Sequence, residues 1–179
     1  GEMGRDVKAA MRAASDDDAV RVIVITGAGR GFCAGADMNT LQVIQGGNAS
    51  ARSSAGGASD FDPNARADFR MANSWFPSVP KPIIGAINGA CAGLGMVYAL
   101  YTDIRFASDA AVFTTAFSKR GLIAEHGLSW LLPRLVGPSR ALELLMTARR
   151  LPAQEAFEMA IAAGVLVLVA SPRQAFWEG

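Results

Sequence analysis

The sequence predicts one α/β domain, and three features support this prediction. Two short apolar runs, Val20–Thr26 and Ile83–Asn88, are rich in β-branched residues, as is typical of strands buried on both faces of a parallel sheet. Each run is followed by a stretch of Gly and Ala and then by a helical pattern. The alternation of strands and helices favours the α/β class, and 179 residues are enough for one core without requiring a second.

The remaining elements follow from periodicity and from chain breakers. Residues 5–15 place Val7, Ala10, Met11 and Ala14 on one face of a helix. Pro138 and Pro152 are expected at helix starts, where a missing N–H costs nothing. Further helices are expected over 38–44, 67–76, 96–101, 127–137, 138–148 and 152–163, and further strands over 103–108, 111–115 and 164–170. The Gly/Ser/Ala-rich residues 46–66 are interpreted as a flexible loop inside the domain.

The composition excludes several classes of protein. A net charge of +1 argues against a nucleic-acid or polybasic membrane surface. One His and two separate cysteines, Cys33 and Cys91, do not make a metal site or a disulfide framework, and both cysteines are expected to be small buried hydrophobes. Charged residues are 18% and hydrophobic residues 51%, which favours an oligomer. No leader or membrane-length apolar run is seen, so we expect a cytoplasmic protein without a membrane span.

The Gly-rich stretches do not match common nucleotide motifs. Phe32 and Tyr98 stand where a dinucleotide fingerprint needs its third Gly, and the chain has no Gly-Lys pair for a Walker A loop. The serine-hydrolase pattern G-x-S-x-G is also absent. Two interpretations stay open. The stretches are tight, packed corners, or they clear side chains away so that two main-chain amides bind a developing anion.

The stretches "GRGFCAGADM", "KPIIGAINGACAGLGMVYALYTDIRFAS" and "RGLIAEHGLSWLLPRLVGPSRALELLMTARRLPAQEA" together resemble the enoyl-CoA hydratase/isomerase (crotonase) superfamily. The resemblance covers most of residues 5–160. It implies a crotonase-like ββα spiral core with C-terminal helices, a homotrimer or dimer of trimers, and a coenzyme A thioester as substrate with no separate cofactor. Against the family pattern, either the protein is expected to be shortened at both ends or the sequence is expected to omit segments of a longer one.

The resemblance also implies roles for individual residues. The two oxyanion donors would be the main-chain N–H groups of Ala36 and Leu94, and only the amide of Leu94 is needed. Arg30 is a candidate phosphate or ribose contact, although an ordinary solvated Arg is the alternative. Further expected contacts of the acyl-CoA are Ala34, Asp37, Met38, Gly93 and Phe117. Asp37 also suits the cap of the next helix, and Phe117, Trp75 and Trp130 suit the core or an acyl-pocket wall.

The departures from the family pattern concern its acids. Val97 and Phe117 stand in the places of the two glutamates of hydratases, so two-acid hydration is not expected. Glu125 matches the acid of several isomerases, and burial in an apolar pocket would raise its pKa. The alternative is a helix-start acid favoured by the helix dipole. His126 is a candidate auxiliary proton carrier, or a surface residue.

These observations leave three functional hypotheses. The leading one is double-bond isomerisation of an acyl-CoA through a two-amide oxyanion hole and Glu125. The second is another reaction in the same site, namely enoyl-CoA hydration, acyl-CoA hydrolysis or C–C cleavage. The third is an acyl-CoA-binding subunit without turnover.

Overall fold

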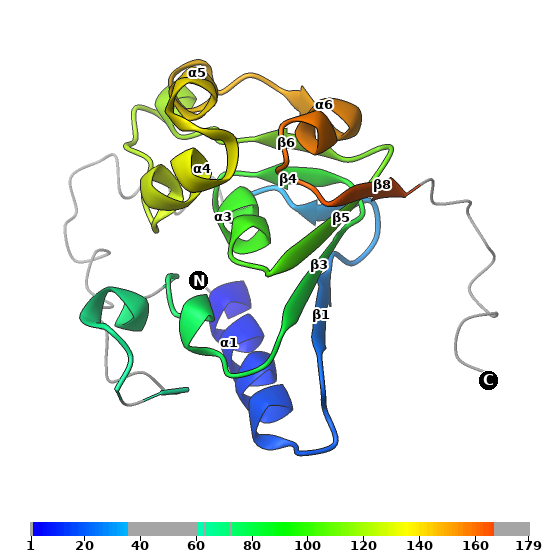
Figure 1. Cartoon of the computed structure of the whole chain (residues 1–179), viewed down its shortest axis with the longest axis vertical. Coiled ribbons are helices and arrows are strands. Elements are labelled where there is room, and N and C mark those ends of the chain that lie inside the picture. The colour runs from blue at the N-terminus through cyan, green and yellow to red at the C-terminus, as the bar shows by residue number, and fades with distance from the viewer. Residues whose placement is uncertain (1, 36–60, 63, 72, 167–179) are drawn as a thin grey trace.

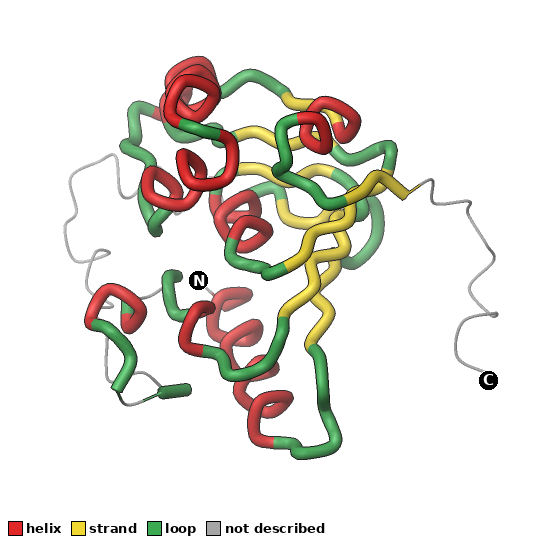
Figure 2. The backbone as a smooth tube through the Cα atoms, viewed as in Figure 1, coloured by secondary structure: helices red, strands yellow, loops and turns green. Residues whose placement is uncertain are grey.

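The computed structural model describes residues 2–35, 61–62, 64–71 and 73–166, and within them it shows two four-stranded sheets (Figures 1 and 2). The strand orders are β1-β3-β5-β8 and β2-β4-β6-β7. The strands are β1 (Ile23–Thr26), β2 (Gly31–Cys33), β3 (Ile83–Ile87), β4 (Ala90–Ala92), β5 (Ile104–Ser108), β6 (Val112–Thr114), β7 (Leu151–Pro152) and β8 (Gly164–Leu166). The α-helices are α1 (Glu2–Asp16), α3 (Leu94–Leu100), α4 (Leu128–Val136), α5 (Pro138–Thr147) and α6 (Ala153–Glu158). The 3₁₀ turns in the described residues are η2 (Ala67–Arg70), η3 (Phe76–Ser78) and η4 (Ser118–Arg120).

The chain alternates between the two sheets as it advances. β1, β3 and β5 pair in parallel in the first sheet, and β2, β4 and β6 pair in parallel in the second. β1, β3 and β5 are therefore each followed, after a short corner, by a strand of the second sheet. This arrangement confirms the α/β class and the ββα spiral with C-terminal helices.

Glycines close the corners between the two sheets. A Cβ atom on Gly27 would lie 2.0 Å from the carbonyl oxygen of Gly31, and one on Gly89 would lie 2.1 Å from that of Arg30. The Asn88 side chain joins the two corners, because it accepts the Gly27 N–H at 3.0 Å and donates to the Gly29 carbonyl at 2.9 Å. At these positions glycine lets the main chain pack closely, which agrees with the interpretation of the Gly-rich stretches as tight, packed corners.

Helix α3 lies at the centre of the core. Gly95 to Leu100 are all buried in it. Next to α3, Phe76 stacks on Tyr101 with ring centroids 5.5 Å apart, and Trp75 stacks on Phe76 at 4.2 Å. Such offset aromatic contacts fix the segment before β3 against the helix. Cys91 is fully buried, as expected, whereas Cys33 is only half-buried.

The structure corrects several details of the sequence prediction. Val20–Thr26 is not buried on both faces, because β1 begins at Ile23 and Val24 is 58% exposed at the edge of the described sheet. Residues 67–76 do not form one helix, since Met71 is extended and separates two 3₁₀ turns. Trp130 is 45% exposed rather than in the core, and the Arg134 guanidinium lies over its ring. The expected helix over 38–44 and most of the loop 46–66 lie outside the described residues.

Replacing Gly95 by Ala is expected to destabilise the fold. A Cβ atom there would lie 2.1 Å from the Cys33 carbonyl oxygen, which belongs to the rigid strand β2. Overpacking of this kind costs about 1–3 kcal/mol, and a clash with main chain belongs at the upper end. Urea unfolding measures the change in the free energy of unfolding.

The matched control is Gly31→Ala. Its Cβ would make only ordinary contacts, the nearest at 3.7 Å to the Ala90 carbonyl oxygen. We expect the free energy of unfolding to change by less than about 1 kcal/mol. Equal losses in the two variants would contradict the close approach of α3 to β2.

Candidate functional site

The ends of β2 and β4 bring the two Gly-rich turns together. Cys33 and Cys91 are register partners in these parallel strands. Two residues after each cysteine, beyond the strand ends, Gly35 and Gly93 meet, and a Cβ atom on Gly93 would lie 4.0 Å from the Cα of Gly35. Both glycines have positive φ, 103° and 52° respectively, which an L side chain rarely adopts. The residues that directly precede positions 36 and 94 are therefore neighbours.

Leu94 opens helix α3, so its amide has no acceptor within the helix. Around it the main chain is fixed, because the Gly93 N–H donates to the Thr114 carbonyl at 3.1 Å and the Gly93 carbonyl accepts the Val97 N–H at 3.1 Å. Ala36, Asp37 and Met38 lie outside the described residues. The convergence of the Ala36 and Leu94 amides on one oxygen therefore stays a prediction.

The other predicted contacts of the substrate have separate surroundings. Arg30 and Ala34 are exposed, which leaves them accessible to a ligand. Val97 and Phe117, which the family resemblance predicts to stand in the places of the hydratase acids, are 0% and 9% exposed. Both side chains are apolar and buried, so neither can supply a proton.

Glu125 and His126 lie in the turn before α4. The His126 Nε2 is 3.6 Å from the Glu125 Oε2, which is an electrostatic contact longer than a hydrogen bond. The Glu125 side chain is 43% exposed, so the expected burial in an apolar pocket was wrong for this chain. The reason is local, because a turn at the surface holds the residue rather than a helix or strand.

Several contacts fix the position of His126. Its φ is 57° and that of Gly127 is 84°, so two consecutive residues adopt the left-handed conformation. The Tyr101 hydroxyl donates to the His126 carbonyl at 3.0 Å. A Cβ atom on Gly127 would lie 2.2 Å from that same hydroxyl oxygen. Such backbone conformations persist only where the surroundings hold them.

Sequence reasoning missed two residues next to this turn, Asn73 and Tyr98. The Tyr98 hydroxyl donates to the Asn73 Oδ1 at 2.8 Å, and the Asn73 Nδ2 is 3.3 Å from the His126 Nδ1. Tyr98 follows Leu94 by four residues in α3 and so shares its helix face. No motif could have revealed the contact, because it joins segments 53 residues apart.

Burial governs the ionisation of the groups in this network. It lowers the pKa of His126 below its ordinary value of 6.5, and the nearby Glu125 opposes the shift. Burial also raises the pKa of Tyr98 to about 12, and the charge of Cys33 adds to the shift. At neutral pH the imidazole is therefore neutral and the phenol keeps its proton.

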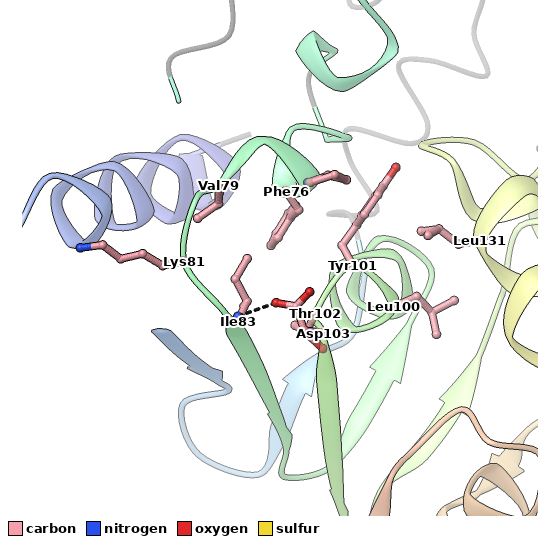
Figure 3. Close-up of a pocket in the computed structure, with 10 residues that line it drawn as sticks. Phe76, Val79, Lys81, Ile83, Leu100, Tyr101, Thr102, Asp103 and Leu131 are labelled. Atoms are coloured by element: carbon pink, nitrogen blue, oxygen red, sulfur yellow. Dashed lines mark hydrogen bonds between the residues drawn. The ribbon is translucent and has the colours of Figure 1, made fainter. Parts of the chain in front are cut away.

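A separate pocket lies under η3, between Phe76, Tyr101 and the start of β3 (Figure 3). Its volume is about 230 Å³, below the roughly 300 Å³ at which ligand pockets begin. Asp103 closes its floor by accepting the Ile83 N–H at 2.7 Å, and Lys81 extends away to carbonyls of the α1 end. None of the predicted site residues that the structure describes lines it, so we do not assign it to the substrate.

In the described parts of the chain, His, Cys, Asp and Glu do not gather in groups of three, as a metal ion would require. No helix described is both long and apolar enough to span a bilayer.

Comparisons with known proteins agree on one family. The family model described as enoyl-CoA hydratase/isomerase matches residues 1–171. The chain is 38% identical over 157 residues to the 1,2-epoxyphenylacetyl-CoA isomerase of Escherichia coli K12, covering 88% of this chain and 56% of that protein. It is 38% identical over 159 residues to a Mycobacterium bovis protein named "Probable enoyl-CoA hydratase echA12", covering 84% and 51%.

A solved structure shows the same fold. The enoyl-CoA hydratase/isomerase of Cupriavidus metallidurans CH34 superposes with a TM-score of 0.77 at 28% identity, covering 93% of this chain and 58% of that one. The chain thus spans about half the length of the curated relatives it matches.

The stability of the chain is expected to depend on pH through His126. Because burial lowers its folded-state pKa, the unfolded chain takes up a proton below pH 6.5 while the folded chain does not. The contribution of His126 to the free energy of unfolding is complete above pH 6.5. It decreases as the pH falls towards the folded-state pKa, by less than about 1.4 kcal/mol per pH unit.

The measurement is urea unfolding of the chain and of His126→Asn between pH 7.5 and 5.5. Asn tolerates the left-handed conformation, and His126 is the single histidine, so the difference between the two proteins isolates its titration. As the pH falls, the free energy of unfolding of the chain with His126 should decrease relative to that of His126→Asn. A constant difference would show that this imidazole titrates alike in both states.

Proposed function

Because this chain belongs to the enoyl-CoA hydratase/isomerase family, we propose that it binds an acyl-CoA thioester and moves a double bond by proton transfer. The thioester carbonyl oxygen is held by the main-chain amides of Ala36 and Leu94. Glu125 removes a proton from one carbon of the acyl chain and returns it to another. The substrate is the coenzyme A thioester itself, and no separate cofactor takes part.

The meeting of Gly35 and Gly93 carries this proposal. Each glycine directly precedes one of the two amides, and each has a positive φ that turns the chain sharply at that point. Amides that leave two adjacent turns can donate to one oxygen. Preorganised N–H donors of this kind stabilise charge where it develops, and the loss of one costs about 10²- to 10³-fold in rate.

The proton balance of the reaction requires one carboxylate. Glu125 takes a proton from the α carbon of a 3-enoyl thioester, and the electron pair of the broken C–H bond passes into a dienolate whose charge rests on the carbonyl oxygen. The dienolate then recovers the same proton at the γ carbon, which gives the 2-enoyl thioester. A positioned acid–base group contributes typically about 10²- to 10⁴-fold.

Two observations favour isomerisation over hydration. Val97 and Phe117 bury apolar side chains in the places where hydratases hold two glutamates. The similarity to a 1,2-epoxyphenylacetyl-CoA isomerase agrees with an isomerase-type reaction.

The assembly is also part of the proposal. Ile123, between η4 and α4, and Met146, in α5, are 79% and 74% exposed. Large apolar side chains at such exposure favour contact with further copies of the chain. A homotrimer, or a dimer of trimers, is the assembly we propose.

The test compares the chain with Glu125→Gln. Both are incubated in D₂O with a 3-enoyl-CoA and with a 2-enoyl-CoA, and the products and the deuterium at the α and γ carbons are measured. We expect Glu125→Gln to lose about 10²- to 10⁴-fold in isomerisation and exchange while binding acyl-CoA with unchanged affinity. Glu158→Gln is the matched control, because Glu158 is an exposed carboxylate on α6 whose partner is Gln154.

The competing functions give different results. Equal turnover in the chain and in Glu125→Gln would remove Glu125 from the mechanism. Release of free CoA, or addition of water to the 2-enoyl thioester, would identify hydrolysis or hydration instead. Tight binding without product or exchange would make the chain a binding subunit.

A further inference from the structure

Three side chains from separate segments form a relay that ends at Glu125. Tyr98 comes from α3, Asn73 from the loop between η2 and η3, and His126 from the turn before α4. Tyr98 donates to Asn73 at 2.8 Å, and Asn73 contacts the His126 Nδ1 at 3.3 Å. The other ring nitrogen, Nε2, is 3.6 Å from the Glu125 carboxylate. Each ring nitrogen of His126 therefore faces a group of defined chemistry.

The first constraint on this relay is the orientation of the Asn73 amide. The Tyr98 side chain is 4% exposed, and within the described chain Asn73 Oδ1 is the acceptor of its hydroxyl proton. Turning the amide over would leave that buried proton without an acceptor, which is unfavourable. With Oδ1 towards Tyr98, the amide presents the N–H of Nδ2 to His126.

The second constraint comes from the opposite side of the ring. An N–H donor facing Nδ1 requires a lone pair there, so the proton of a neutral ring is on Nε2. Nε2 faces the Glu125 carboxylate, where an N–H is attractive and a lone pair is repulsive. Both sides of the ring thus favour the same tautomer. Burial keeps the imidazole neutral by lowering its pKa, which agrees with a single ring proton.

We propose that Asn73 and Tyr98 are positioning residues that hold His126 as the Nε2–H tautomer, with this N–H directed at Glu125. The ring then presents a fixed dipole to the carboxylate and limits the directions in which it points. The assignment to catalysis depends on the proposed role of Glu125, whereas the tautomer itself does not. The backbone contacts of His126 with Tyr101 keep the ring in place for this function.

The tautomer is directly measurable, because His126 is the single histidine of the chain. The chain is labelled with ¹⁵N-histidine, and long-range ¹H–¹⁵N correlation spectra are recorded at pH 7.5. We expect a protonated, pyrrole-type Nε2 and an unprotonated, pyridine-type Nδ1. A proton on Nδ1, or the averaged pattern of a free imidazole, would overturn the proposal.

Asn73→Asp is the decisive variant. Asp has the same shape and still accepts the Tyr98 proton, but its second oxygen now faces Nδ1 and can only accept. We therefore expect the spectrum to show a proton on Nδ1. Asn64→Asp is the control, since it makes the same chemical change at an exposed loop position and should keep the original pattern. An unchanged pattern in Asn73→Asp would contradict the relay.

A second variant separates the relay from general damage to the fold. Tyr98→Phe removes the hydroxyl that orients the amide, so we expect a mixture of the two tautomers. Circular dichroism and the melting temperature confirm that each variant is folded.

Activity tests the positioning role apart from the tautomer. In the assay with 3-enoyl-CoA, Asn73→Asp is expected to lower kcat by roughly tenfold, the size of one neutral hydrogen bond, with KM unchanged. An inverted tautomer with unchanged kcat would refute the positioning role. Failure of the proposed function would give a different result: neither the unchanged chain nor its variants would turn over 3-enoyl-CoA, while the expected tautomers would still be observed.

Discussion

The contact between the main chain of α3 and the carbonyl group of Cys33 is the constraint on which this site depends. Gly95 allows the first turn of α3 to approach the end of β2 so closely that a single methyl group would collide with it. The same approach brings Gly93 against Gly35, and with them the start of α3 against the chain that leaves β2. Without it, the two Gly-rich turns would be separate corners with no common ligand.

The fold was largely predictable, because the apolar runs and the helical periods are local signals. From residue 83 to residue 166 every expected strand and helix has a counterpart, although the helix expected over 152–163 ends at Glu158 and the short strand β7 was not expected. The two short strands Gly31–Cys33 and Ala90–Ala92 were hidden, since Gly and Ala have low strand propensity and close backbone packing selected them. The exposure of Val24 was missed for a related reason, because an apolar run does not tell which face of an edge strand is covered.

The candidate site was less predictable than the fold. The positions of Glu125 and His126 follow from motif resemblance, but their surroundings come from contacts distant in sequence. Asn73 falls in the helix predicted over 67–76, which does not form. Because the chain is irregular there instead, the Asn73 amide reaches the His126 ring. A buried Tyr in a helix gives no sign that its hydroxyl fixes an amide 25 residues away.

In the proposed reaction, apolar side chains at Val97 and Phe117 and a single carboxylate at Glu125 are consistent with one another. Hydration adds the elements of water to a double bond, so it requires one group to activate the water and another to supply the carbon with a proton. Isomerisation has no net proton change, so one base can accept a proton from one carbon of the acyl group and release it to another carbon a few ångströms away. In the proposed reaction the amides carry the charge that develops on oxygen, which leaves Glu125 only the transfer. A neutral His126 suits this task, because it places a dipole beside the carboxylate without adding a positive charge. Such a charge would stabilise the Glu125 anion and make it a weaker base for the substrate proton.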